Sequence, residues 1–447
     1  MSPLSKRPRA TAEPMRTLDE KFVSNAIVYE VARPTGTMIV DSAPFRLPDG
    51  TLDRQLVNAA WEQFIVGSPA VRQRLMRAPL GLFTPSWVYT GKVDLRTHIR
   101  FHPEVVEWDP KHVALLTGAF NGPMNPRGPL WDVYVVELST GDLACAVRIH
   151  HAIGDGMFGL VLISRFVHTE PQQLVPETRS IIPFPEDPRA PRDPITLSIA
   201  ARRAVKAKYA SFAEEWVDWK RKPIVKRLKR VGGRNIRAIR DVYIRRSGLL
   251  ERSIKPRDAA ILQVDLPTAK KAARAAGGSV ADLTVAVALK AFAALHPEST
   301  EIATLVPVSP RRDRGGDTRN HVSMVRVAVA RELTLAESVA SVRAQVQHAV
   351  DTGESGITRG AKDWLGYASY LPVFAREMYF GQSAVRSMTL WPVTEPDDEA
   401  AVFASSYRSH LDIAISVRLD LDVALFVGTI ESALEELGAP VLSGVES

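Results

Sequence analysis

The sequence predicts a mixed α/β fold, with strands and helices divided between two domains. Strand-like and helix-like runs follow one another without the regular strand–helix–strand repeat of a doubly wound sheet. The chain has 447 residues, and single hydrophobic cores rarely exceed about 250 to 300 residues. Seven prolines between Pro171 and Pro194 exclude regular helix there and indicate an extended crossover. We therefore expect a first domain over residues 1–190, a linker over 191–256 and a second domain over 257–447.

The N-terminal residues, Met1 to Glu20, are expected to form a flexible basic arm. Lys6, Arg7 and Arg9 are not followed by an apolar core, so this stretch is not a secretory signal. No run of eighteen apolar residues occurs in the chain, so no membrane-spanning helix is predicted. The single cysteine, Cys145, excludes an internal disulfide and fits a reducing compartment. We expect a cytoplasmic protein.

The most informative stretch is His150–Gly156, His-His-Ala-Ile-Gly-Asp-Gly, which follows a predicted strand. Leu143 to Ile149 is mostly apolar and is bounded by Thr140-Gly141-Asp142, which is typical of a buried strand. Because successive strand side chains point to opposite faces, the two histidines cannot easily converge on one target. A neutral imidazole can take a proton from a hydroxyl that attacks a carbonyl. We predict that one of His150 and His151 is a general base and that the other packs into the protein body.

Asp155 and Gly156 complete this stretch. Asp155 is predicted to hold the loop through an ion pair with an arginine or to orient the imidazole, and Gly156, which lacks a Cβ, lets a substrate approach closely. Residues 154–159 also fit the dinucleotide pattern G-x-G-x-x-G, but an aspartate inside that loop would face a pyrophosphate. A metal site is not expected, because adjacent strand positions diverge and Cys145 is the only cysteine.

A strongly basic segment follows the prolines. From Ala201 to Arg252 the chain carries seventeen Lys and Arg against five Asp and Glu, a net of +12 in a chain whose total is +7. Apolar and aromatic residues recur in it at helical spacing, namely Val205, Tyr209, Phe212, Trp216 and Trp219. This stripe either lies on an anionic membrane or lipid droplet, as a peripheral contact, or docks on the protein's own core. No nucleic-acid-binding motif accompanies the charges, so we expect no nucleic-acid partner.

The second half is predicted to contain strands over 260–266, 303–308 and 322–329 and helices over 267–276 and 283–295. Gly277-Gly278 would end the first helix. Ser279 or Asp282 would cap the second, which is apolar almost all round and therefore expected to be buried.

The pattern H-H-x-x-x-D-G resembles the signature of the CoA-dependent acyltransferase superfamily. That superfamily includes chloramphenicol acetyltransferase, peptide-synthetase condensation domains and the wax ester synthase/diacylglycerol acyltransferases. Pro129-Leu130-Trp131, upstream of the histidines, resembles the Pro-Leu-Trp strand of the last group. Further similar segments are Trp87 with Asp94 and His98, Val306-Pro307-Val308-Ser309 with Asn320 and Ser323, and Ser406-Tyr407 with Leu411 and Asp420. The resemblance covers roughly Leu18 to Leu437.

Two segments depart from that family. Its Asn-Asp pair at a helix start reads Ala281-Asp282, and its Asn-Val-Pro-Gly-Pro segment is replaced by residues 382–386, Gln-Ser-Ala-Val-Arg. The resemblance implies two chloramphenicol acetyltransferase-like sandwich domains with the active site in a tunnel between them. It also implies tunnel-lining or supporting roles for Pro129, Leu130, Trp131, Asp282, Ser309 and Asn320.

Together these observations predict an O-acyltransferase that moves a long-chain acyl group from acyl-CoA to diacylglycerol or a long-chain alcohol, giving triacylglycerol or wax ester. His151 would deprotonate the hydroxyl without a covalent enzyme intermediate, since the chain has no G-x-S-x-G elbow. Acyl-CoA is a substrate, and no metal or other cofactor is expected. The linker and the loop Arg311-Arg312-Asp313-Arg314 are candidates for binding its phosphates.

Three alternatives share the motif. The chain would then be a related acyltransferase for another hydroxyl or an amine acceptor, a condensation domain that takes carrier-protein thioesters, or a non-catalytic lipid-binding relative.

Overall fold

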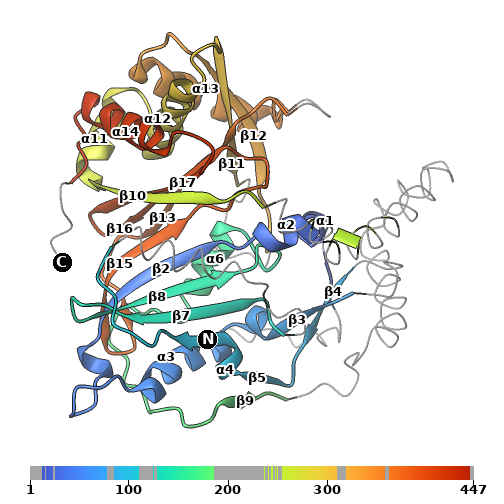
Figure 1. Cartoon of the computed structure of the whole chain (residues 1–447), viewed down its shortest axis with the longest axis vertical. Helices are drawn as coiled ribbons and strands as arrows, with labels where there is room; N and C mark the ends of the chain where they lie inside the picture. The colour runs from blue at the N-terminus through green and yellow to red at the C-terminus, as the bar shows by residue number, and fades with distance from the viewer. Residues whose placement is uncertain are drawn as a thin grey trace.

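The computed structural model describes residues 13–15, 17–23, 26–77, 85–109, 124, 128–185, 236, 240, 243–244, 247, 249, 254–309, 319–357 and 362–442. These residues form two lobes, each built on a mixed sheet (Figure 1). The predicted mixed α/β fold is confirmed. Most of the linker and of the basic segment 201–252 lies outside the described residues, as does the loop 311–314. The predicted membrane or lipid-droplet contact therefore stays a prediction.

The main sheet of the first lobe has its described strands in the order β14-β15-β2-β8-β7-β6, antiparallel except for β6 beside β7. Their bounds are β2 Thr35–Asp41, β6 Ile99–Phe101, β7 Trp131–Glu137, β8 Asp142–Ile149, β14 Tyr379–Phe380 and β15 Ser383–Trp391. The described helices of this lobe are α1 Thr17–Lys21, α2 Ala26–Val31, α3 Arg54–Gly67, α4 Leu95–His98 and α6 Gly156–Ile163. Two smaller sheets, β1-β4-β3 and β5-β9, consist of β1 Glu13–Pro14, β3 Gln73–Met76, β4 Ser86–Tyr89, β5 Lys92–Asp94 and β9 Ile181–Pro183. The strand predicted over 143–149 is confirmed as β8.

An aromatic core holds the first lobe together. Helix α3 begins at Asp53, whose carboxylate accepts hydrogen bonds from two backbone N–H groups of the first turn. The buried face of this helix carries Trp61 and Phe64. The Trp61 ring lies 5.0 Å from that of Phe380, and the Phe64 ring lies 5.3 Å from that of Trp131. These contacts anchor β14 and β7 to one helix.

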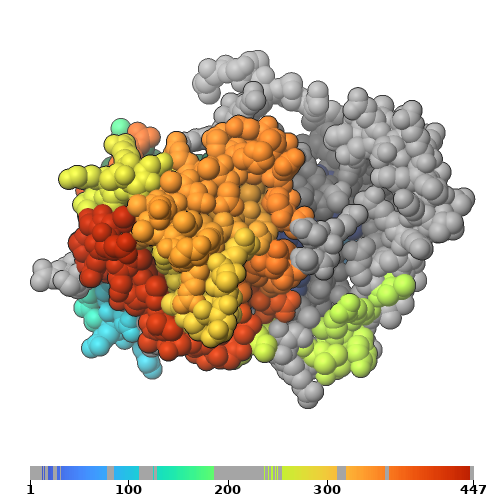
Figure 2. Space-filling view, turned by 90° about the horizontal axis from the view of Figure 1, so that it is seen from above, coloured from blue at the N-terminus to red at the C-terminus, as the bar shows by residue number. Residues whose placement is uncertain are grey.

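The second lobe consists of a sheet with four helices packed on it (Figure 1). Figure 2 shows the molecule from above, where the yellow, orange and red segments of the second half gather together. Its described strands have the order β10-β17-β16-β13-β11-β12, with parallel pairing only of β16 with β13 and of β13 with β11. Their bounds are β10 Arg257–Asp265, β11 Glu301–Val308, β12 Ser323–Ala330, β13 Gly366–Phe374, β16 Ala400–Tyr407 and β17 His410–Arg418. The helices are α11 Leu266–Ala275, α12 Val280–Leu295, α13 Leu335–Thr352 and α14 Val423–Glu436. Among the described helices none is by itself long and apolar enough to cross a membrane, and α11 and α12 pass that test only as a pair bent by 80°.

The predicted strands and helices of the second half are confirmed with small shifts. Helix α12 begins at Val280 rather than Leu283, because both proposed caps act together. The Ser279 hydroxyl accepts a hydrogen bond from the backbone N–H of Asp282, and the Asp282 carboxylate accepts one from the backbone N–H of Ser279. Gly277 ends α11 with a φ of +77°, a conformation that glycine adopts without strain.

Strand β15 joins the two lobes. Although it comes from the range predicted for the second domain, it pairs with β2 in the sheet of the first lobe (Figure 1). The Thr389 hydroxyl donates to the carboxylate of Asp412 on β17, and Trp391 Nε1 donates to the Thr37 hydroxyl over 2.9 Å. Residues 383–386, in the segment that departs from the family pattern, start this strand.

The expectation of a flexible N-terminal arm over Met1–Glu20 is wrong for the part that the structure describes. Strand β1 pairs with β4, and the side chains of Met15 and Asp19 are buried. Strand β1 and helix α1 are too short to show a hydrophobic period in the sequence. Contacts with residues distant in the sequence hold them in place, which a local pattern does not predict.

Candidate active site

His150 and His151 follow β8 and point to different surroundings, as strand geometry predicts. The His150 side chain has 0% exposure. Its Nδ1 accepts a hydrogen bond from the backbone N–H of Ala152, so Nε2 carries the proton and donates to the Tyr29 carbonyl oxygen over 3.1 Å. Burial, together with the positive charge of Arg33, lowers the pKa of His150 to about 3. His150 is therefore a neutral, packed histidine.

His151 is half-buried and lies where the two lobes meet. Its Nδ1 is 3.1 Å from Oδ1 of Asn320, which comes from the second lobe. The ring of Phe22 stacks on the imidazole at 4.1 Å between centroids. Burial lowers the pKa of His151, and a hydrogen bond with its own backbone and the charge of the Asp155 carboxylate partly oppose this effect. The imidazole is thus neutral near pH 7, and among the described residues its Nε2 makes no hydrogen bond, which leaves a lone pair for a substrate proton.

Asp155 links the two lobes beside His151. It caps α6 by accepting a hydrogen bond from the backbone N–H of Phe158, and its second oxygen accepts one from the backbone N–H of His321 over 2.8 Å. Its own N–H donates to the Arg319 carbonyl oxygen. The structural role expected of Asp155 therefore operates through backbone groups of residues 319–321.

Gly156 sits at a close approach between the lobes. A Cβ at this position would lie 3.3 Å from Cδ2 of Leu371 on β13. At Gly154 a Cβ would lie 2.2 Å from the Phe158 ring, so that glycine is needed for packing inside the loop. Because Gly156 has no side chain, β13 of the second lobe can approach the start of α6 this closely.

Pro129, Leu130 and Trp131 support the motif from within the first lobe. Leu130 accepts a hydrogen bond from the backbone N–H of His150 at its carbonyl oxygen, and Pro129 bridges to Arg74. Trp131 is 1% exposed, and its Nε1 donates to the Val71 carbonyl oxygen. These residues hold β7 and the start of the motif in place.

The remaining predicted residues come from the second lobe and separate into two groups. Asn320 contacts His151, and the Ser309 hydroxyl donates to the carbonyl oxygen of His321, the residue after Asn320, over 3.4 Å. Asp282 instead belongs to the cap of α12 and lies 3.7 Å from Arg343. The sequence did not point to Asp19 and Phe22, because one aspartate and one aromatic residue in a short segment give no signal above background.

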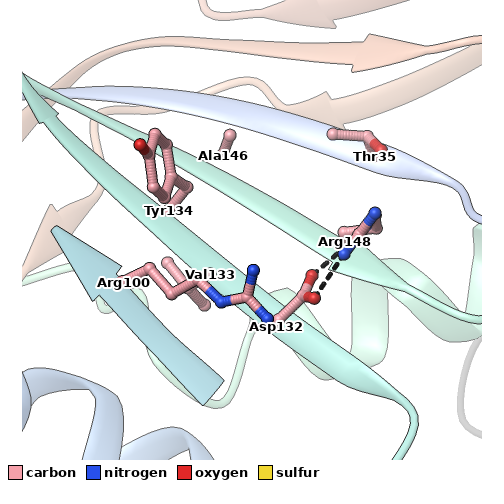
Figure 3. A pocket seen from close by; sticks show the side chains of 7 residues that line it. All are labelled: Thr35, Arg100, Asp132, Val133, Tyr134, Ala146 and Arg148. Carbon is pink, nitrogen blue, oxygen red and sulfur yellow. Dashed lines mark hydrogen bonds and ion pairs between the residues drawn. The ribbon is translucent and has the colours of Figure 1, made fainter. Parts of the chain in front are cut away.

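Two cavities lined by described residues differ greatly in size. The first, of about 10 Å³, lies on the first sheet, where Arg148 and Asp132 form a buried ion pair (Figure 3). It has room for about one water molecule. The second, of about 630 Å³, is lined by Lys270 and Arg274 of α11 and by Arg343 of α13. Among the described residues no group of His, Cys, Asp and Glu is arranged to hold a metal ion.

Comparison with known sequences identifies a family. The model of the wax ester synthase/diacylglycerol acyltransferase catalytic domain matches residues 34–284, a range that includes His150–Gly156. Two proteins of Mycobacterium tuberculosis with provisional diacylglycerol O-acyltransferase names are 28% identical over 123 residues and 34% identical over 110 residues. These matches cover 27% and 24% of this chain, and only 24% and 23% of the relatives.

Solved structures share the fold across almost the whole chain. The wax ester synthase/diacylglycerol acyltransferase from Marinobacter aquaeolei VT8 matches with a TM-score of 0.57 at 14% identity, covering 95% of this chain and 98% of that one. The first condensation domain of the calcium-dependent antibiotic synthetase matches with a TM-score of 0.57 at 13% identity, covering 97% and 99%. The starter condensation domain of rhizomide synthetase, solved with C8-CoA, matches with a TM-score of 0.55 at 10% identity, covering 96% and 94%. These likenesses establish a two-lobe fold of the chloramphenicol acetyltransferase kind.

Proposed function

The chain belongs to the wax ester synthase/diacylglycerol acyltransferase family, and from that premise we propose that it moves a long-chain acyl group from acyl-CoA to the hydroxyl of diacylglycerol or a long-chain alcohol. The observation that carries the proposal is the position of His151. Its neutral imidazole lies where the two lobes meet, has Nδ1 engaged by Asn320 and leaves Nε2 for a substrate.

In the proposed reaction His151 is the general base. Nε2 takes the proton of the acceptor hydroxyl while its oxygen attacks the thioester carbonyl carbon. The tetrahedral intermediate collapses as the carbon–sulfur bond breaks, and the imidazolium returns the proton to the departing CoA sulfur. The products are an ester and free CoA. A base contributes about 10²- to 10⁴-fold, and holding both substrates between the lobes contributes further.

The test is acyl transfer from radiolabelled palmitoyl-CoA to a panel of diacylglycerol, long-chain alcohols and amines. We expect ester formation by the natural chain and a loss of about 10²- to 10⁴-fold in His151→Ala. His150→Gln serves as the matched histidine control and should lose less, because His150 packs against Tyr29 and does not face a substrate. Undiminished transfer by His151→Ala would overturn the mechanism. Transfer only from carrier-protein thioesters, or only to amines, would replace the proposed substrates.

We assign the donor's phosphates to the open hollow at α11 and α13. Lys270, Arg274 and Arg343 surround it, and among the described residues Lys270 and Arg274 have no ion-pair partner. Tyr370 of β13 also lines the hollow, while the next residue along the strand, Leu371, lies against Gly156. Neighbouring residues of a strand face opposite sides. The hollow and the motif His150–Gly156 therefore lie on opposite sides of β13. The pantetheine arm of CoA would connect the two.

Comparing two donors tests this assignment. The double variant Lys270→Ala/Arg274→Ala should raise KM for palmitoyl-CoA by at least about tenfold, since even one charge-assisted hydrogen bond contributes about 1.5 to 3 kcal/mol. Its KM for palmitoyl-pantetheine, which lacks the nucleotide phosphates, should stay the same. Lys271→Ala removes one positive charge from the same helix outside the hollow and should change neither. Equal effects on both donors would exclude the hollow as the phosphate site.

A further inference from the structure

The N-terminal segment reaches the active site through Asp19. This residue of α1 is 2% exposed, and its Oδ1 accepts a hydrogen bond from Nδ2 of Asn320 over 2.9 Å. Asn320, 4% exposed, comes from the second lobe and contacts His151 of the first. Three segments distant in the sequence therefore meet in one chain of contacts, from Asp19 through Asn320 to His151.

The partners of Asn320 leave its amide one orientation. Nδ2 lies 2.9 Å from Oδ1 of Asp19 and 2.9 Å from the His151 carbonyl oxygen. An ionised carboxylate and a backbone carbonyl only accept hydrogen bonds. Turning the amide over would place its oxygen against both acceptors and leave buried groups without donors, which costs about 1 to 3 kcal/mol for each group. The amide oxygen must therefore face Nδ1 of His151.

This orientation favours one of the two positions for the ring proton of His151, beside the hydrogen bond that the ring makes with the backbone of His151 itself. Oδ1 of Asn320 is 3.1 Å from Nδ1 and accepts only, so Nδ1 must donate. The neutral ring then has its lone pair on Nε2. If the amide were turned over, its NH₂ group would favour the lone pair on Nδ1 and would put the proton on Nε2, where it could not accept a substrate proton.

We propose that Asp19 is a positioning residue that sets the tautomer of His151 through Asn320. The inference rests on the proposed function only in taking His151 as the base. Two anchors hold Asn320: Asp155 holds the backbone on both sides of it, at Arg319 and His321, and Asp19 holds its side chain. The charges of Asp155 and Lys21 also act on the imidazole, where Asp155 raises its pKa and Lys21 lowers it.

The direct test is ¹⁵N NMR of the full chain labelled at histidine, with the His151 signal identified by its loss in His151→Gln. The natural chain should show the Nδ1–H tautomer. Asp19→Asn keeps the shape of the side chain, but the new amide can both donate and accept hydrogen bonds. Asn320 can then adopt both amide orientations, so the His151 signal should move towards a mixture of tautomers. Asp19→Glu keeps an acceptor-only carboxylate and should restore the natural signal. Glu20→Gln removes an equal charge from the same helix and should leave the signal unchanged.

Kinetics supply the second readout. Asp19→Asn should lower kcat by about tenfold, less than the 10²- to 10⁴-fold lost when a general base is removed, with little change in KM. Asn320→Ala removes the bridge itself and should give the same mixed tautomer, which keeps the test decisive if Asp19→Asn folds poorly. An unchanged Nδ1–H tautomer in both variants would overturn the inference. The natural protein could instead fail to transfer acyl groups while the variants still change the His151 tautomer. That result would support the inference about Asp19 and overturn the proposed function.

Discussion

Phe22 covers one face of His151, with the two ring planes 15° apart. The contact excludes water from an imidazole whose pKa is already lowered, first of all by burial. It also restricts substrate approach to the edge of the ring.

Opening this face should raise the pKa of His151. In Phe22→Ala water reaches the imidazole, the charged form becomes less unfavourable, and the acid limb of the kcat profile should move to higher pH. Activity at pH 6 should therefore fall more than activity at pH 8. Phe22→Leu keeps an apolar cover and should shift the limb less. A limb that stays in place in Phe22→Ala would show that Phe22 does not shield the base.

Removing the charge of Asp155 should destabilise the junction between the lobes. In Asp155→Asn one of the two backbone donors, Phe158 N–H or His321 N–H, faces an NH₂ group instead of an acceptor. We expect a loss of about 1 to 3 kcal/mol in the free energy of unfolding, measured by urea denaturation. Asp422→Asn is the matched control, because Asp422 caps α14 with a single hydrogen bond and is exposed. An equal loss in both variants would argue against an inter-lobe role for Asp155.

The sequence predicted the elements better than the connections between them. The short apolar run of β8 and the longer apolar run of α12 depend on residues adjacent in the chain, so local pattern was enough to find them. The pairing of β15 with β2 and the contact of Asp19 with Asn320 depend on residues hundreds of positions apart, and no local pattern records them. For the same reason His151 was found from its motif, while Phe22 and the hollow at Lys270 appeared only in the structure.

His150 should make the fold sensitive to acid. Its pKa is about 3 in the folded chain against an ordinary value of 6.5, so the unfolded chain binds more protons between these pH values. The free energy of unfolding should therefore rise from pH 4 to pH 6.5 and then level off. His150→Gln removes this titration while keeping a donor and an acceptor, so its stability should change less between pH 5 and pH 7.5 than that of the natural chain. Urea denaturation at pH 5 and pH 7.5 measures the free energy of unfolding of both proteins. An equal change between the two pH values in the natural chain and in His150→Gln would contradict a lowered pKa of His150.

Thr389 should stabilise the joint between β15 and the second sheet through Asp412. Burial raises the pKa of Asp412, and the donors Thr389 and Gln263 oppose that rise by stabilising its carboxylate. Thr389→Val removes one donor at nearly constant volume, so the buried carboxylate loses a partner and unfolding at pH 7 should require about 1 to 3 kcal/mol less free energy. Since a protonated Asp412 needs fewer donors, the deficit should shrink as the pH falls through its raised pKa. Thr389→Ser retains the hydroxyl and should show a smaller deficit. Urea denaturation from pH 4 to pH 8 measures both variants, and a Thr389→Val deficit that is constant over this range would mean that packing, rather than the Asp412 charge, determines the cost.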